Sequence, residues 1–197
     1  MPANNATSNP WLDGPRSYGR ISRVLHWAIA LLFFWQFMGM IVKIAFGLNP
    51  RDSWIIHTHP EVGFILMVLM VVRALWAFCN MRRRPSHGTG FIARCAIFGH
   101  FGLYVLMLLV PLTALVRAWA NGRGFAFLHA IPIVSPGQAR PEILHFINIT
   151  RESTGMSVHG LLGWMLLLLI VGHITMVIVH QWIWRDATLN KMLGTPR

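Results

Sequence analysis

Apolar residues run along this chain in four long stretches, separated by shorter segments rich in Arg, Gly and Pro. The stretches cover residues 24–46, 62–80, 91–116 and 157–184. A helix needs about 20 apolar residues to cross a hydrocarbon core of about 30 Å, so each stretch is long enough to span a bilayer. The pattern predicts an all-α fold, an integral membrane bundle of four helices.

The four stretches divide the 197 residues into a polar tail and one membrane domain. Residues 1–17 contain Pro, Gly and Asn and no long apolar run, which predicts a flexible N-terminal tail. Residues 18–197 then form a single four-span domain, with no room left for a separate soluble catalytic domain. Any chemistry is therefore expected inside the bundle or at its two faces.

The basic residues predict how the bundle is oriented. Ten Lys and Arg residues lie on the side of the two termini, and six lie on the opposite side. Because cytoplasmic loops carry an excess of Lys and Arg, both termini are predicted to be cytoplasmic. The net charge of +11 follows from these anchoring residues, and no extended basic surface indicates a nucleic-acid partner. The six outer residues are Lys43, Arg51, Arg117, Arg123, Arg140 and Arg151.

Cysteine usage and the lack of known motifs exclude several kinds of site. There is no C-x-x-C-H for covalent c-type haem, and Cys79 and Cys95 form no cysteine cluster that suits an iron–sulfur centre. Walker, G-x-S-x-G and H-E-x-x-H motifs are also absent. Histidine remains as the candidate for chemistry, and three histidines lie in the last apolar stretch.

The spacing of histidines in the last stretch is the most specific signal. His159 and His173 are 14 residues apart, so at about 100° and 1.5 Å per residue they share one helix face about 21 Å apart in depth. This separation suits a protein that holds two haems at two depths, each bound axially by an imidazole. His180 is near the same face but close to the inner end of the span, where it can instead reach the membrane surface.

Each haem needs a second axial ligand at the same depth. His59 opens the second span at the outer level of His159, and His26 opens the first span at the inner side, nearer His173. The sequence therefore predicts two iron-ligating pairs, His59 with His159 and His26 with His173. Bis-histidine ligation leaves no open position on iron, which favours electron transfer over oxygen binding. His57, two residues before His59, is a rival for the outer position.

Two glycines support the choice of ligands. Gly63 and Gly163 each follow a candidate ligand by four residues, on the same helix face, where a missing side chain lets a porphyrin approach the backbone. The alternative is that they are small residues that allow close helix packing. His57 has no glycine four residues later, so His59 is preferred.

Four stretches, "SRVLHW", "HTHPEVGFILMVLMVVRALW", "GHFGLYVLMLLVP" and "VHGLLGWMLLLLIVGH", together with "WRDATL", resemble the bacterial cytochrome b561 family. The resemblance covers essentially the whole chain after the tail. It implies a multi-pass protein of the bacterial inner membrane with two haem b groups bound by His26, His59, His159 and His173. His100 matches a histidine of the family's third span.

Within this family, the chain resembles the small di-haem type that oxidises superoxide. That similarity implies an enzyme, a superoxide:ubiquinone oxidoreductase, with periplasmic superoxide as donor and ubiquinone as acceptor. Arg23, His100 and His180 lie toward the inner side and are candidate contacts for quinone or for haem propionates. Each of the three could equally contact lipid headgroups.

Two alternatives stay open on the sequence alone. The chain could be a quinone-linked cytochrome b anchor for a dehydrogenase or hydrogenase partner, with the long segment between the third and fourth spans as the docking surface. It could also be a haem-free transporter or structural bundle, with its histidines in hydrogen bonds or proton relays. The first alternative needs a partner protein, and the second predicts a colourless protein.

Overall fold

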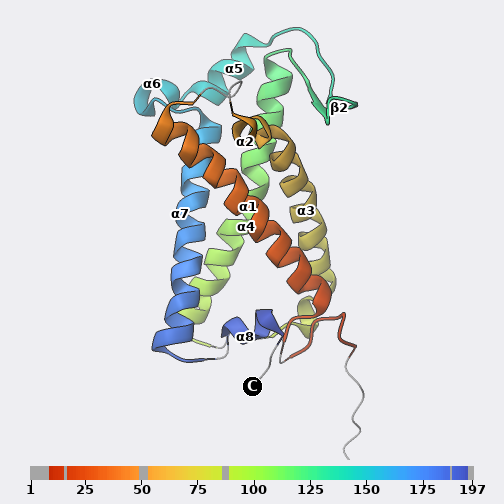
Figure 1. Ribbon diagram of the computed structural model, residues 1–197, viewed down its shortest axis with the longest axis vertical. Helices are drawn as coiled ribbons and strands as arrows, with labels where there is room; N and C mark the ends of the chain where they lie inside the picture. Colours follow the sequence, from red (N-terminus) through yellow and green to blue (C-terminus); the bar gives the residue numbers. More distant parts are fainter. Residues whose placement is uncertain (1–8, 16, 49–52, 86–88, 187, 195–197) are drawn as a thin grey trace, which may run out of the picture.

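Four long helices form the body of the computed structural model, which describes residues 9–15, 17–48, 53–85, 89–186 and 188–194 (Figure 1). Each of the four is long and apolar enough to cross a membrane, so the predicted four-span helical bundle is confirmed. The helices are α1 (Arg20–Phe46), α3 (His59–Cys79), α4 (Phe91–Ala120) and α7 (Val158–Ile178), and the π-helical turn η2 (Val179–Ile183) continues α7.

Local sequence signals mark the ends of these helices. α1 stops at Gly47, which adopts the left-handed conformation with φ 62° that commonly terminates helices. Pro60 lies in the first turn of α3, where its missing N–H costs no helical hydrogen bond. Ser157 caps α7, because its hydroxyl accepts a hydrogen bond from the Gly160 N–H at 3.4 Å.

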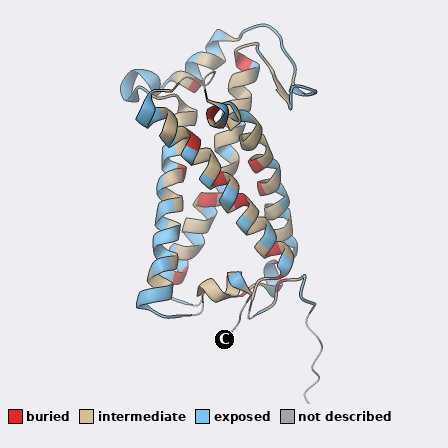
Figure 2. Ribbon diagram, viewed as in Figure 1, coloured by how far each residue is buried: buried red, intermediate tan, exposed pale blue. Residues whose placement is uncertain are grey.

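The helices pack in a series, α1 on α3, α3 on α4 and α4 on α7. Buried positions are few and scattered along them, and many outward side chains are exposed (Figure 2). Large exposed apolar side chains such as Phe34, Leu75 and Leu168 suit a surface that faces lipid. The buried apolar centre consists of Ile29, Phe33, Leu66, Met70, Leu103, Leu106 and Leu166.

The first and last described segments of the chain meet at one end of the bundle (Figure 1). The Tyr18 N–H donates to the Lys191 carbonyl at 3.1 Å, and Arg23 Nη1 donates to the Leu193 carbonyl at 2.7 Å. Lys191 and Leu193 belong to the short helix α8 (Thr188–Leu193). We call this end the inner end; that it faces the cytoplasm stays a prediction.

Part of the N-terminal segment is bound to the inner end. Asp13 is buried, its Oδ1 accepts the Gly19 N–H at 2.8 Å, and its Oδ2 forms an ion pair with Arg84 Nε at 3.1 Å. The Arg20 guanidinium lies over the Trp11 ring. The segment around Asp13 therefore packs against the inner end, and the flexible tail over residues 1–17 stays a prediction. Residues 1–8 and 16 lie outside the described part of the chain.

Short elements form the opposite, outer end of the bundle. A β-hairpin is among them, in which Phe127 of β1 pairs with Ile131 of β2 in antiparallel register. The all-α prediction missed this hairpin, because strands of three and four residues are too short to give a clear alternating pattern. The elements are α2 (Trp54–His57), β1 (Phe125–Phe127), β2 (Ile131–Val134), α5 (Pro141–Asn148) and α6 (Arg151–Thr154).

Candidate haem sites

The outer histidine pair joins the first turns of two spans. His59 is the first residue of α3, and His159 is the second residue of α7. Their ring centres lie 6.1 Å apart, with an interplanar angle of 80°. The structure thus brings together the two outer histidines that the sequence pairs by depth.

The Nδ1 atoms of the two outer histidines have different surroundings. His159 Nδ1 lies 2.9 Å from the Val110 carbonyl, which can only accept, so Nδ1 carries the proton and Nε2 keeps its lone pair. Metal-binding histidines are usually oriented by such a second hydrogen bond. His59 Nδ1 is buried and has no hydrogen-bond partner among the described residues. A buried polar atom without a partner is unfavourable unless something else satisfies it.

The inner site contains three imidazoles rather than two. His26 of α1 and His173 of α7 have ring centres 6.4 Å apart, at 72°. His100 of α4 also lies beside His173, with ring centres 5.3 Å apart. His100 Nδ1 also lies 2.7 Å from the Ala96 carbonyl, one turn earlier on its own helix. The inner pair predicted by depth is therefore close in space, with His100 beside it.

The ring separations fit an iron ion between the members of each predicted pair. An imidazole nitrogen binds a metal ion at about 2 Å, so the centres of two rings on opposite sides of one ion lie roughly 6 Å apart. The spacings of 6.1 Å and 6.4 Å match this value. The spacing of 5.3 Å between His100 and His173 is shorter. His26 is therefore the better partner for His173.

The two candidate haem-packing glycines have different surroundings. A Cβ atom added at Gly163 would meet nothing within 4 Å, so open space lies over this face of α7. A Cβ atom at Gly63 would lie 3.2 Å from the side-chain nitrogen of Gln36, which donates to the His59 carbonyl at 2.9 Å. Gly163 thus fits a porphyrin face, whereas Gly63 allows the close approach of Gln36.

His57, the alternative outer ligand, lies beside His129. It is exposed at the end of α2, and its ring stacks on that of His129 with centres 6.1 Å apart. The ring of His159 faces His59 instead. The structure therefore favours His59 over His57 as the partner of His159.

Two of the residues expected near quinone or propionates hold the C-terminal segment. Arg23 Nη1 binds the Leu193 carbonyl, while Arg23 Nε is buried without a partner among the described residues. His180 Nδ1 lies 2.5 Å from Asp186 Oδ2. Burial raises the pKa of Asp186, but hydrogen bonds from Thr188 and His180 outweigh this, so its pKa lies below the ordinary value.

Arg73 lies in a stretch that resembles the family, but the sequence analysis assigned it no functional role. It lies within α3, its Nε donates to the Tyr104 hydroxyl at 3.1 Å, and its Nη1 donates to the Ser22 carbonyl at 3.3 Å. Its charge acts on both His26 and His173, and it makes no salt bridge among the described residues. The sequence feature that could have identified it is a single charged residue inside an apolar span, which is a candidate functional site by default.

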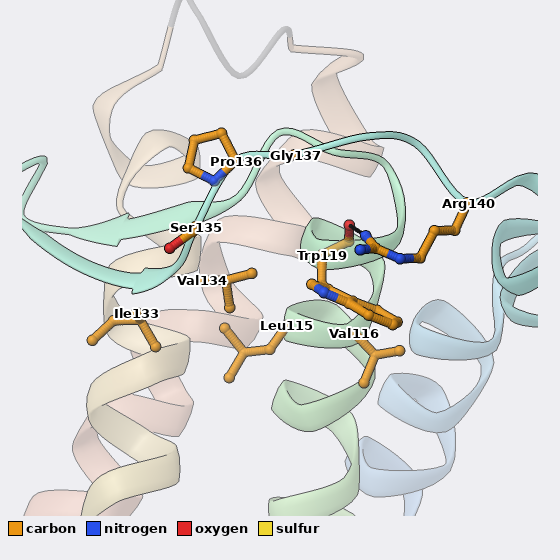
Figure 3. Close-up of a pocket in the computed structure, with 9 residues that line it drawn as sticks. All are labelled: Leu115, Val116, Trp119, Ile133, Val134, Ser135, Pro136, Gly137 and Arg140. Atoms are coloured by element: carbon orange, nitrogen blue, oxygen red, sulfur yellow. Dashed lines mark hydrogen bonds between the residues drawn. The ribbon is translucent and has the colours of Figure 1, made fainter.

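A shallow hollow opens at the outer end of α4, between this helix and β2 (Figure 3). The Arg140 guanidinium stacks on the Trp119 ring at 3.9 Å and donates to the Trp119 carbonyl at 3.3 Å. Leu115, which lines the hollow, is five residues beyond Val110, or about 7.5 Å further out along the helix. The hollow thus lies outward of the outer histidine pair. Of the six predicted outer cations, Arg51 lies outside the described residues.

The fold defines a four-span helical membrane protein with imidazole pairs at two depths. Residues 17–195 match the family model described as prokaryotic cytochrome b561, and the chain belongs to this family. Cytochrome b561 homolog 2 of Escherichia coli K12 is 27% identical over 185 residues, which cover 91% of this chain and 93% of that protein. The probable superoxide oxidase CybB of Yersinia pestis is 22% identical over 188 residues, which cover 92% and 98%.

Family membership carries several properties to this chain. Cytochromes b561 bind haem b and transfer electrons within membranes, which makes the chain a haem protein of oxidoreductase type. Together with its four apolar helices, membership makes it a multi-pass protein of the bacterial inner membrane. The predicted family and location are therefore confirmed.

Proposed function

We propose that this protein is a di-haem b enzyme that passes electrons from periplasmic superoxide to ubiquinone in the membrane. The observation that carries the proposal is the presence of two histidine pairs, with ring centres 6.1 Å and 6.4 Å apart. Their α7 members, His159 and His173, are 14 residues apart. His59 and His159 would hold the outer haem, and His26 and His173 the inner haem. Haem b bound by two histidines supplies reversible one-electron transfer without an open iron position.

The proposed reaction balances when two superoxide anions react for each ubiquinone. Two superoxide anions lose one electron each and leave as O2, and one ubiquinone gains two electrons and two protons to become ubiquinol. The name of the Yersinia pestis relative, probable superoxide oxidase, supports this donor. The outer-end cations Lys43, Arg117, Arg123, Arg140 and Arg151 would attract an anion toward the outer pair.

On the inner side, three residues have proposed roles in binding rather than in ligation. Arg73 would pair with a propionate of the inner haem, because a cation in a span without an acidic partner needs an anion. His100, beside His173, would contact quinone or supply a proton to it. Arg23 binds the C-terminal segment, and its buried Nε, which has no partner in the described part of the chain, could bind a propionate or quinone oxygen.

One observation favours a second candidate, a quinone-linked anchor subunit for a dehydrogenase or hydrogenase. The outer elements expose Leu128, Phe146 and Ile149, at 61%, 71% and 55% of their surface, beyond the ends of the spans. A partner protein could cover these side chains. A haem-free bundle is no longer proposed, because the family binds haem b.

A visible spectrum with a haem count tests the di-haem proposal. Purified protein should show sharp bands on reduction and contain two haem b groups per chain by extraction. The His145→Ala variant should match the wild type, because His145 is exposed and lies outside both pairs. A stoichiometry of one haem per chain in fully folded protein would refute the two-site assignment.

A further inference from the structure

A third histidine pair lies at the outer end and has no role in the proposed haem chemistry. His57 ends α2, and His129 lies in the turn between β1 and β2. Both side chains are exposed, and their rings lie nearly parallel, with centres 6.1 Å apart and an angle of 15°. More than 70 residues separate the two histidines in the sequence, so tertiary structure alone brings them together.

The turn that carries His129 has an unusual backbone. Leu128 and His129 both adopt positive φ angles, 52° and 58°, although neither is glycine. Each such residue costs about 1–2 kcal/mol relative to a right-handed conformation. The Glu61 carboxylate of α3 accepts the Leu128 N–H at 3.0 Å and thereby holds this turn. Strained residues of this kind cluster at functional sites.

Both histidines are also fixed from the side of the bundle. The Phe64 ring of α3 packs against Phe127, with ring centres 5.3 Å apart, and this contact anchors the hairpin. The Thr58 hydroxyl, next to His57, accepts the indole N–H of Trp35 at 3.0 Å and donates to the Ile55 carbonyl at 2.9 Å. Contacts of the hairpin and of α2 with the bundle therefore hold the two imidazoles next to each other.

We propose that His57 and His129 form a binding site for a divalent transition-metal ion such as Zn²⁺ or Cu²⁺. Their ring centres lie 6.1 Å apart, and both side chains are exposed, so rotation of the stacked rings can bring one nitrogen of each to about 2 Å from a single ion. Imidazole is a preferred ligand of both ions. Water completes the coordination, because both rings are exposed and the described residues offer no cluster of three or more ligating side chains.

Two measurements on the purified, haem-loaded and untagged protein test this site. Equilibrium dialysis against micromolar Zn²⁺ counts the bound metal, and electron paramagnetic resonance of added Cu²⁺ reports its nitrogen ligands. We expect one tight site per chain, with a Cu²⁺ signal split by two nitrogens that excess Zn²⁺ removes. His57→Ala and His129→Ala should each weaken binding at least tenfold.

His145→Ala is the matched control, because His145 is an exposed histidine of α5 at the same end of the molecule. It should bind metal like the wild type, and the haem spectrum of every variant serves as the check on folding. Equal Zn²⁺ binding by the wild type and the His57→Ala/His129→Ala double variant would overturn the site. A loss of binding in His145→Ala as large as in His129→Ala would overturn it too.

Discussion

The histidines of this chain differ in what their Nδ1 atoms meet. His159 Nδ1 meets the carbonyl of Val110, on another helix, which fixes its proton and leaves the lone pair on Nε2, in a ring whose centre lies 6.1 Å from that of His59. His100 Nδ1 meets a carbonyl of its own helix, whereas His180 Nδ1 meets the Asp186 carboxylate, just before α8. A ring with a carbonyl partner is suited to bind a metal through its other nitrogen, and a ring paired with a carboxylate serves here as a structural link.

The ligand assignment predicts which haem each single substitution removes. His159→Ala should abolish the outer haem and leave the inner haem largely in place, and His173→Ala should do the reverse. The two sites are independent enough for this because they are about 21 Å apart along α7. Redox titration of the visible bands, with a haem count per chain, measures both. Retention of two haems in either variant would show that the substituted histidine is not a ligand.

Arg73 is predicted to raise the midpoint potential of the inner haem and to leave that of the outer haem unchanged. Its positive charge lies near His26 and His173 and favours the reduced haem, which carries one positive charge less. Loss of a nearby charge is worth about 1–2 kcal/mol at an effective dielectric constant of about 20. For one electron this equals roughly 40–90 mV, so Arg73→Gln should lower the inner midpoint potential by that amount.

Arg73→Lys is the matched control for this prediction, because it keeps the charge and loses the planar guanidinium. It should shift the inner potential less than Arg73→Gln does, and the outer potential should stay unchanged in both variants. Equal shifts of both haems would indicate a general loss of packing rather than a local charge effect.

Among the elements, α7 contributes a histidine to both predicted pairs. One residue of each predicted pair comes from this helix, on one face, and the partners come from α3 and α1. Gly163 lies one turn after His159 on that face, with open space over its backbone. α7 therefore fixes the depth of both sites, and the other helices determine which ring completes each pair.

A larger side chain at position 163 should block the outer site. Gly163→Leu would fill the open space over α7, so we expect loss of most of the outer haem with the inner haem retained. Gly163→Ala adds only one methyl group and should keep both haems. Quantitative haem extraction, with redox titration to assign the remaining haem, distinguishes these outcomes. Full outer-haem content in Gly163→Leu would mean that no porphyrin lies over this glycine.

The sequence predicted the elements that long apolar runs specify and missed the short ones. Long apolar runs specify the four spans, and the 14-residue spacing on α7 specifies the two levels. The hairpin at Phe125–Val134 gave no such signal, because its strands are too short. The binding of Asp13 to Arg84 and the contacts of Arg73 could not be predicted, because each depends on residues far apart in the sequence.

At the scale of the whole molecule, the two ends of the bundle differ in construction. The inner end is tied by the N-terminal segment and α8, through Tyr18, Arg23 and the ion pair of Asp13. The outer end carries the hairpin, the hollow beside Trp119 and a set of cations. An anion that arrives from the periplasm would meet this outer end first, if the termini lie in the cytoplasm as the distribution of basic residues predicts.

The donor proposal makes a prediction about the whole outer surface. If superoxide delivers electrons there, the rate of haem reduction should fall with ionic strength, because the Debye length shrinks from about 10 Å at 0.1 M salt to about 3 Å at 1 M. Arg140→Glu should slow reduction further at low salt and leave the haem spectrum unchanged. Stopped-flow mixing with superoxide, in the presence of a quinone analogue, measures both effects.

Arg84→Glu would be a poor control for this experiment, because Arg84 pairs with the buried Asp13. Arg94→Glu is the better one, since Arg94 is exposed at the start of α4, at the inner end, and makes no salt bridge among the described residues. It should reduce as fast as the wild type if superoxide arrives from the outer side. Haems that stay oxidised for seconds at low salt would exclude superoxide as the donor. Reduction that then appears only on addition of a dehydrogenase subunit would identify the chain as an anchor, with the same histidine pairs conducting the electrons.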